Sequence, residues 1–327
     1  MTRPKITVLT DPMPWGLELL YESARRIARS LRDTLSPNQQ YFNHPKYRGH
    51  FAVTRSLIEG LQQINASFNY NPRYPWSVAD TVIVLAGART LRQAIRLKQQ
   101  GRIKKLFAGP NIVIYSSDYD SILAAPEVDA AITPCEWVVD IYLEDNPTLK
   151  DRIFAWPAGV DIHYWQPDPA IKRDSILIFE KQNKGPVGPV APYADYLRAL
   201  GWTVQVIQYG TYTHDQYLHI LQRSCLMLGF VVCESQGLAW AEAWSTDVPT
   251  LILKKTTNLY KGRHYKNSSA PYLRPQNGLF FDDLEDFKTQ FSYWETNREQ
   301  FTPRAWTLEN MSDEVCASLL YKKVIEC

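Results

Sequence analysis

Short apolar runs alternate with segments of helical period along the first half of the chain. The apolar runs predict strands over residues 5–10, 81–87, 112–115, 130–133 and 153–156, with a shorter one around residue 106. Apolar positions at helical spacing predict helices over residues 17–35, 51–64, 90–104 and 134–144. Strands that alternate with helices favour a parallel sheet, whose ligands bind at the carboxyl ends of the strands.

The second half repeats this pattern. It predicts strands over residues 175–179, 203–208, 225–233, 250–253 and 278–281. Helices are expected over residues 193–200 and 214–223, in the stretch before residue 250, and over 308–324. At 327 residues the chain exceeds the usual length of one domain. We therefore expect two βα domains of about 150 residues each.

The composition is that of an ordinary globular protein, with 45% hydrophobic and 21% charged residues. No apolar run approaches the roughly 18 residues that span a bilayer, and the N-terminus leads into a strand without a signal-peptide core. We therefore expect a cytoplasmic protein. The five cysteines include no C-x-x-C pair, so neither a disulfide framework nor a zinc site is expected.

The charge is unevenly distributed along the chain. Residues 1–105 hold 17 Lys and Arg against 6 Asp and Glu, a net charge of +11, whereas residues 106–327 carry −9. One side of the helix predicted over 17–35 carries Arg25, Arg26, Arg29 and Arg32. Such a basic face can rest on the anionic inner face of a membrane, and it is also typical of the solvated side of a packed helix.

Two acids, Glu234 and Glu242, mark the place where the apolar run 225–233 meets a helical stretch. The helix start would expose the unpaired backbone N–H groups of Ser235, Gln236, Gly237 and Leu238, and such groups favour phosphate oxygens. A carboxylate further along the same helix can then reach a ribose. Without the surrounding strand and helix start, two acids eight residues apart would be typical of a solvated helix face.

This segment resembles the signature of retaining GT-B glycosyltransferases, especially glycosyltransferase family 4. The matching residues are Glu234, Gly237, Leu238, Glu242, Ala243 and Pro249, while Asp247 stands where the family often has Gly. The resemblance implies two Rossmann-like βα domains that face each other across a cleft. It also implies that Glu234 contacts the donor sugar, that Gly237 and Leu238 bind its diphosphate, and that Glu242 binds the ribose.

The segment Ala158–Pro167 resembles the interdomain linker of the same family. We therefore expect an acceptor-side domain over 1–160, a nucleotide-sugar-binding domain over 161–305, and a C-terminal helix over 306–327 that crosses back to the first domain. By the same resemblance, Lys181 and Lys184 would hold the donor phosphates, and the turn containing Tyr209, Gly210 and Tyr212 would bind the nucleotide base. Lys181 and Lys184 are equally interpretable as surface lysines in a loop.

The first domain lacks the histidine that the family often uses as a sugar contact. Acceptor contacts could come instead from Trp15, Gly16, Gly49 and His50, each of which also has a plain structural interpretation. Asp118 and Asp120 imitate the D-x-D pair with which GT-A enzymes bind a divalent metal, but the order of elements favours two βα domains. The six histidines show no metal-ligand spacing, so no metal is expected.

The sequence as a whole predicts a metal-independent retaining glycosyltransferase. It would use a nucleotide-diphosphate sugar, a UDP- or GDP-sugar, as substrate and need no cofactor. The acceptor would be an anionic or membrane-surface glycan precursor. Two alternatives stay open: a nucleotide-sugar epimerase, and a non-catalytic protein that binds nucleotide or glycan. A nucleic-acid partner is not expected, because the aromatic residues of the basic third do not interleave with its cations.

Overall fold

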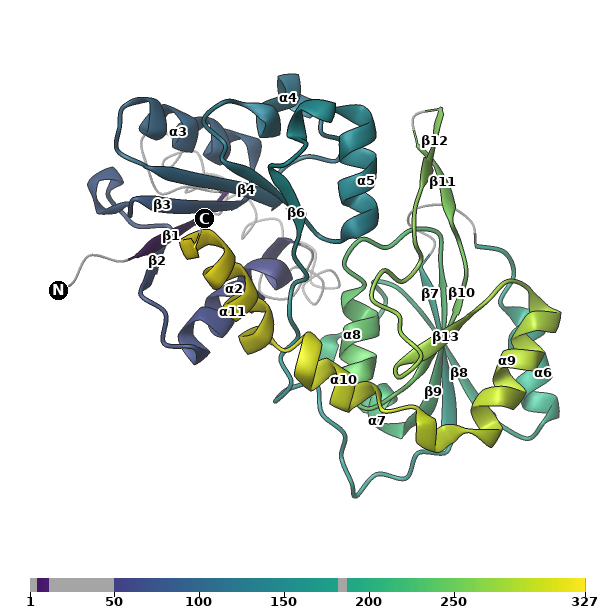
Figure 1. Ribbon diagram of the computed structural model, residues 1–327. Coiled ribbons are helices and arrows are strands. Elements are labelled where there is room, and N and C mark those ends of the chain that lie inside the picture. Colours follow the sequence, from purple (N-terminus) through teal and green to yellow (C-terminus); the bar gives the residue numbers. More distant parts are fainter. Residues whose placement is uncertain (1–4, 12–49, 182–186, 261, 327) are drawn as a thin grey trace, which may run out of the picture. The chain divides into compact units, whose positions relative to one another are not determined.

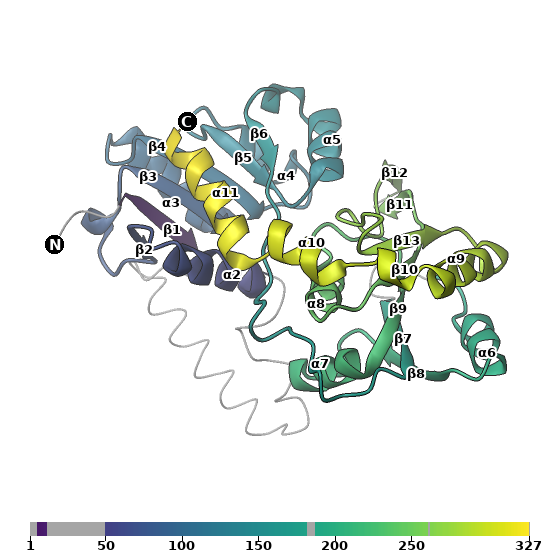
Figure 2. The same cartoon turned by 60° about the horizontal axis from the view of Figure 1, so that its bottom comes forward.

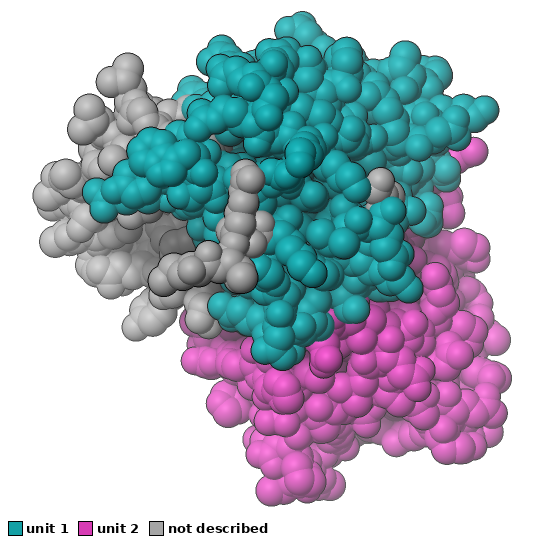
Figure 3. Space-filling view, turned by 60° about the vertical axis from the view of Figure 1, so that its left-hand side comes forward, with its two compact units in different colours: residues 1–158, 316–327 teal, residues 159–315 magenta. Residues whose placement is uncertain are grey.

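The computed structural model describes residues 5–11, 50–181, 187–260 and 262–326. The chain forms two compact units, which Figure 3 shows in different colours. Unit 1 comprises Met1–Ala158 and Cys316–Cys327, and unit 2 comprises Gly159–Val315. The units therefore divide after Ala158 and Val315, where the sequence predicted boundaries after residues 160 and 305. None of the helices in the described ranges is long and apolar enough to cross a membrane.

Unit 1 is built on a six-stranded parallel sheet of order β2-β1-β3-β4-β5-β6. Its strands are β1 (Ile6–Thr10), β2 (Phe68–Tyr70), β3 (Thr81–Ala86), β4 (Lys105–Asn111), β5 (Ala130–Thr133) and β6 (Ile153–Ala155). Every residue of β1 and β3 is buried, as expected for a parallel sheet that is covered on both faces.

Helices cover both faces of this sheet (Figures 1 and 2). They are α2 (His50–Gln63), α3 (Ala88–Gln99), α4 (Asp118–Ser121), α5 (Glu136–Asp145) and α11 (Asp313–Glu326). Helices α2 and α11 lie on one face and α3 on the other (Figure 1). The Trp156 indole N–H, just after β6, donates to the Cys316 carbonyl at 2.8 Å, so the end of the chain is fixed to unit 1.

Unit 2 is built on a five-stranded parallel sheet of order β13-β10-β9-β7-β8. Its strands are β7 (Ser175–Lys181), β8 (Thr203–Gln208), β9 (Ser224–Val231), β10 (Thr250–Leu253) and β13 (Gly278–Phe281). Its helices are α6 (Ala191–Ala199), α7 (His214–Arg223), α8 (Leu238–Ser245), α9 (Leu284–Thr296) and α10 (Pro303–Asn310).

The two faces of this sheet belong to two separate hydrophobic cores. Leu177 and Phe179 of β7 point into the core that α7 and α8 cover, with Tyr217 and Trp240. Ile176 and Ile178 point the other way, into the core that α6 and α9 cover. This alternation follows from the two-residue period of a strand, and the burial of both faces explains the continuous apolar run of β7.

An antiparallel hairpin of β11 (Thr257–Tyr260) and β12 (Arg263–Lys266) forms a separate two-stranded sheet in unit 2. This hairpin, β2 and α9 were not predicted from the sequence. The hairpin follows β10 after three residues and extends away from the five-stranded sheet (Figure 1).

Two predicted elements are wrong. Residues 112–115 do not form a strand, because the Asp118 carboxylate accepts the backbone N–H groups of Ile114 and Tyr115 and holds the segment in a turn. The closing helix predicted over 308–324 is two helices, α10 and α11. Their break lies where Val160 N–H donates to the Met311 carbonyl at 2.8 Å and Asp313 N–H donates to the Val160 carbonyl at 3.2 Å.

Candidate functional site

The carboxyl ends of β7 and β9 bring together a lysine and a glutamate that lie 53 residues apart in sequence. Lys181 is the last residue of β7 and pairs in register with Val231, the last residue of β9. Glu234 follows β9 by three residues. The Lys181 ammonium donates to Glu234 Oε1, and the two side chains are only 15% and 10% exposed. The structure therefore places a mostly buried ion pair at this edge of the sheet.

The ion pair fixes the charge of Lys181. Burial alone would lower the pKa of Lys181, but the charge of Glu234 and the hydrogen bond to it raise the pKa above its ordinary value. The ammonium also lies 4.5 Å from the centre of the Tyr209 ring, within the range of a cation–π interaction. Lys181 is therefore a fixed cation between a carboxylate and an aromatic ring.

The second oxygen of Glu234 caps the start of α8. Glu234 Oε2 accepts the Gly237 N–H at 3.2 Å, and the Glu234 N–H donates to the Ser268 carbonyl at 2.8 Å. A carboxylate at a helix N-terminus is favoured by the unpaired amides and the helix dipole. An unpaired amide was expected at Gly237 from the sequence, but in the structure this amide is already bonded to Glu234.

Position 237 requires a glycine, both because of its backbone conformation and because a neighbouring side chain leaves no room for a Cβ atom. Its φ of 66° lies in the left-handed region, and a Cβ there would stand 2.7 Å from Trp240 Cδ1. Trp240 is 1% exposed and its indole N–H donates to the Ser269 carbonyl at 3.0 Å, so it has no room to move. Trp240 therefore sets the position of the loop, a role that the sequence analysis missed.

The tight packing of Trp240 could have been suspected from the sequence, because a glycine, Gly229, stands within the apolar strand β9. A Cβ at Gly229 would stand 2.7 Å from Trp240 Cη2. A glycine inside a strand often marks such a close approach. The Ser268 and Ser269 carbonyls, which hold the same loop, have no comparable signal in the sequence.

Glu242 is half-buried on α8, beside a group of tyrosines. Burial, then the neighbouring Tyr212, then the charge of Glu242 raise the pKa of Tyr217 far above its ordinary value. Tyr212 packs edge-on against Phe179, with ring centres 6.0 Å apart, whereas Tyr209 is 45% exposed. Of the two tyrosines predicted to bind the base, Tyr209 is therefore the more exposed, and Tyr212 is half-buried.

The remaining predicted residues are placed as follows. Gln236 and Leu238 are half-buried beside Gly237, and Gly210 adopts a φ of 89° in the turn after β8. Asp247, where the family often has Gly, has a φ of 62° after the end of α8, a conformation that glycine favours. Lys184, Trp15, Gly16 and Gly49 lie outside the described residues, as do the arginines at 25, 26, 29 and 32. His50 begins α2, but its side chain is also outside the described set.

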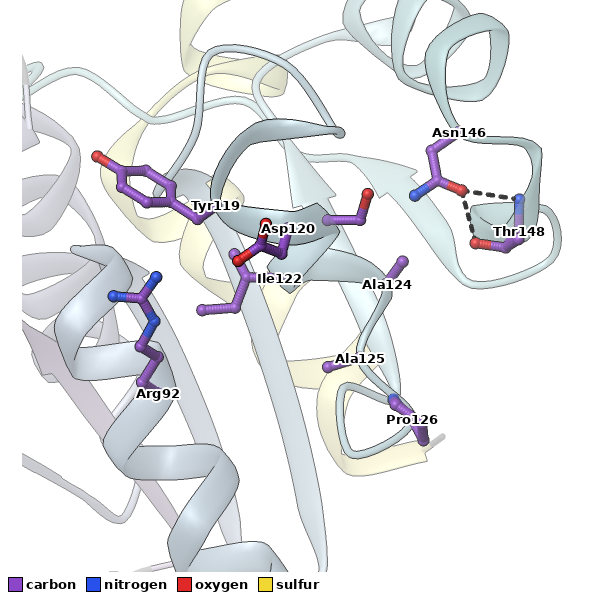
Figure 4. Close-up of a pocket in the computed structure, with 10 residues that line it drawn as sticks. Arg92, Tyr119, Asp120, Ile122, Ala124, Ala125, Pro126, Asn146 and Thr148 are labelled. Atoms are coloured by element: carbon purple, nitrogen blue, oxygen red, sulfur yellow. Dashed lines mark hydrogen bonds between the residues drawn. The ribbon is translucent and has the colours of Figure 1, made fainter.

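Asp118 and Asp120, whose spacing imitates a D-x-D pair, lie in different surroundings. The Asp118 carboxylate is used by the backbone of Ile114 and Tyr115, at 3.0 and 2.9 Å. Asp120 instead lines an open depression of about 580 Å³ that contains Arg92 and Tyr119 (Figure 4). Within the part of the chain that the structure describes, no group of three His, Cys, Asp or Glu could hold a metal ion.

The comparisons with known proteins rest on structure. No family model and no curated protein matches the chain. A glycosyltransferase from Rickettsia africae ESF-5 matches with a TM-score of 0.55 at 10% identity, over 98% of this chain and 99% of that one. Sucrose-phosphate synthase from Thermosynechococcus elongatus matches with a TM-score of 0.54 at 10% identity, over 85% of this chain and 94% of that one. This chain has the GT-B fold.

A third solved structure, the GtfA/B complex, matches with a TM-score of 0.53 at 14% identity. The match covers 75% of this chain and 57% of that one. At such identities the similarity shows the fold alone. The fold class predicted from the sequence is therefore confirmed, and the chemistry must be argued from the residues at the carboxyl edge of unit 2.

Proposed function

We propose that the protein is a retaining glycosyltransferase that binds a nucleotide-diphosphate sugar at the carboxyl edge of the unit 2 sheet. The observation that carries this proposal is the buried Lys181–Glu234 pair over the start of α8, with Tyr209 against the lysine. Ligands of open α/β sheets bind at this edge, and a fixed cation beside a helix start suits a diphosphate.

The pair supplies the charges that sugar transfer needs. In the proposed reaction the bond between the anomeric carbon and the phosphate oxygen breaks, and a bond from the same face to the acceptor oxygen forms. The departing phosphate accepts the proton of the acceptor hydroxyl, so no strong protein base is required. Lys181 would stabilise the charge that grows on the diphosphate, which requires no metal.

The other residues would hold the rest of the donor. Glu234 would bind hydroxyls of the sugar through the carboxylate that now accepts from Lys181 and Gly237. Glu242 would bind the ribose, and the exposed ring of Tyr209 would stack on the base. A diphosphate that approaches Lys181 would compete with Glu234 for the ammonium, which would free the carboxylate for the sugar.

Unit 1 would bind the acceptor. Residues 1–105 carry a net charge of +11, and Arg89, Arg92 and Arg96 among them are exposed on α3. A positive surface raises the local concentration of anionic ligands. We therefore propose an anionic acceptor or a glycan precursor carried at a membrane surface.

The decisive experiment compares nucleotide binding and donor hydrolysis in the wild type and in Glu242→Ala. UDP, GDP and ADP, and their sugars, would be screened by calorimetry and by release of free sugar. Loss of a hydrogen-bonded carboxylate should weaken the preferred nucleotide by about tenfold or more. Glu309→Ala, an exposed acid on α10, is the matched control. Equal affinity in all three proteins would refute the assigned ribose contact.

A non-catalytic nucleotide-binding protein is the second candidate. It is favoured by the engagement of both Lys181 and the Gly237 amide with Glu234. Such a protein would show nucleotide binding that depends on Glu242 but no release or transfer of sugar with any donor. An epimerase would instead convert the donor sugar without an acceptor, which product analysis of the same incubations would detect.

A further inference from the structure

The hairpin β11–β12, together with the three residues before it, is the most basic segment of unit 2. Residues 254–266 contain five Lys and Arg and one His, with no Asp or Glu. The chain from residue 106 onward carries a net charge of −9, so this concentration of positive charge opposes its surroundings. A local cluster of cations of this kind points to an anionic partner.

The hairpin has one exposed face and one half-buried face. In the register of the two strands, Thr257 lies opposite Lys266 and Leu259 lies opposite His264. These four residues share one face because side chains alternate along a strand, and all four are exposed. Leu259 is 58% exposed. Asn258 and Tyr265, on the other face, are half-buried. The exposed face therefore combines a large apolar side chain, Leu259, with one cation, Lys266, and with His264.

The base of the hairpin is bonded to the candidate site. The Asn267 side-chain amide donates to the Val232 carbonyl at 2.8 Å, next to the Glu234 loop. Ser268 accepts the Glu234 N–H, and the Ser269 hydroxyl donates to the Leu253 carbonyl at 2.8 Å. Whatever binds the exposed face is thus held at a fixed position relative to Glu234.

We propose that the hairpin β11–β12 docks on an anionic lipid surface. Lys266 of the exposed face, with Lys254 and Lys255 just before the hairpin, would contact the headgroups, and Leu259 would enter the boundary between headgroups and acyl chains. Lys254 lies 3.8 Å from Asp282 in an exposed ion pair, for which the headgroup phosphates would compete. A soluble polyanion would engage the cations and leave Leu259 in water, which is why a lipid surface fits the face better. That this membrane carries the acceptor rests on the function proposed above; the docking surface is argued from the hairpin alone.

The test is flotation of the full-length protein with lipid vesicles, without nucleotide. The wild-type protein should float with vesicles of phosphatidylglycerol and phosphatidylcholine, and high salt should release it from them. It should not float with vesicles of phosphatidylcholine alone. Each lysine near the surface contributes a factor of about five, so Lys254→Gln/Lys255→Gln/Lys266→Gln should lower the partition coefficient on the order of 100-fold. Leu259→Ser should lower it by about tenfold while leaving the charge unchanged.

The matched control is Lys150→Gln/Lys172→Gln/Lys322→Gln. These three lysines are exposed outside the hairpin, and the variant has the same net charge as the hairpin variant. An equal loss of flotation in both triple variants would overturn the proposal, because net charge would then explain the binding. The proposal would also be overturned if the wild-type protein did not float with anionic vesicles, or if it bound soluble polyphosphate more tightly than these vesicles.

Nucleotide affinity measured on the same hairpin variants separates this proposal from the proposed function. Unchanged affinity with lost flotation supports a docking surface that is distinct from the donor site. Lost affinity in Lys254→Gln/Lys255→Gln/Lys266→Gln would assign these cations to the donor instead, and would overturn the membrane assignment. Absence of any nucleotide binding in the wild type would refute the proposed function and leave the flotation result standing.

Discussion

Gly87 in unit 1 and Gly237 in unit 2 occupy comparable positions. Each lies between a central strand and a helix, at the N-cap of α3 or α8, and each has a positive φ, of 94° and 66°. A carboxylate lies at each helix start. Asp11 accepts the Thr90 hydroxyl beside Gly87, and Glu234 accepts the Gly237 amide. The two units thus share a glycine, a helix start and an acid.

The two helix starts differ in whether a cation pairs with the acid. Among the described residues no Lys or Arg pairs with Asp11, which is exposed at the end of β1. Glu234 is buried and pairs with Lys181. A helix start with an acid is therefore a feature of the fold, whereas the buried charge pair is specific to unit 2. This contrast is the reason for placing the chemistry in unit 2.

The largest expected effect comes from Lys181→Met. The substitution leaves the Glu234 carboxylate buried without its cation, which should lower the free energy of unfolding by about 3–5 kcal/mol. Asp11→Asn, its counterpart in unit 1, should cost less than about 1 kcal/mol because that carboxylate is exposed and no described cation pairs with it. Urea denaturation of both variants measures the contrast.

The double variant Lys181→Met/Glu234→Gln sharpens this test. With both charges removed, the penalty of an unpaired buried carboxylate disappears, so the double variant should be more stable than Lys181→Met alone. If the losses of unfolding free energy in the two single variants simply added up in the double variant, the two side chains would not interact. The comparison between the units would then lose its basis.

The same pair predicts a loss of stability at alkaline pH. The pKa of Lys181 is raised in the folded protein above its ordinary value of 10.5, so the folded state holds this proton more tightly than the unfolded chain. The contribution is therefore fully present below pH 10.5 and is lost as the pH rises through the folded pKa. The difference in unfolding free energy between wild type and Lys181→Met should stay constant from pH 7 to 10 and shrink above. A difference that is already smaller at pH 8 than at pH 7 would contradict this.

Gly237→Ala should be the next most damaging change, at about 2–3 kcal/mol of unfolding free energy. It combines an unfavourable left-handed φ with a Cβ at 2.7 Å from the buried Trp240. Gly210 also has a positive φ, of 89°, but a Cβ there would meet open space, so Gly210→Ala should cost about 1–2 kcal/mol. Equal thermal-denaturation shifts in the two variants would show that the Trp240 contact does not restrain the loop.

The sequence predicted most of the strands because their apolar runs are long and buried on both faces. Thr81–Ala86 and Ser175–Lys181 are examples, each with almost every residue buried. The hairpin β11–β12 was missed because its strands have only four residues each and lack the apolar period of a buried strand. The closing helix was predicted as one because its break at Met311–Ser312 depends on Val160, more than 150 residues away.

The sequence allowed the residues of the site to be chosen, but it did not show that Lys181 and Glu234 contact each other. Glu234, Lys181 and Tyr209 were selected through the resemblance to glycosyltransferase family 4, and each lies just after a predicted strand. That Lys181 and Glu234 pair with each other depends on the neighbouring positions of β7 and β9 in the sheet, which no local pattern records. The occupied Gly237 amide is different, because its acceptor Glu234 lies only three residues earlier in the chain. An acid just before a helix start is a common cap, so this contact was open to prediction from the sequence and was missed.

The smallest expected effect concerns the ring beside the cation. Tyr209→Ala removes a cation–π contact at 4.5 Å from a mostly buried ammonium and should lower the unfolding free energy by about 0.5–1 kcal/mol, whereas Tyr209→Phe keeps the ring and should change little. In unit 1, Arg92 lies 5.6 Å from the exposed ring of Tyr119, so Tyr119→Ala should cost less than Tyr209→Ala. Because the Tyr209 effect acts through Lys181, it should vanish in a Lys181→Met background. Persistence there, in a double-mutant cycle followed by urea denaturation, would assign Tyr209 to packing against Phe179, whose ring centre lies 6.4 Å away.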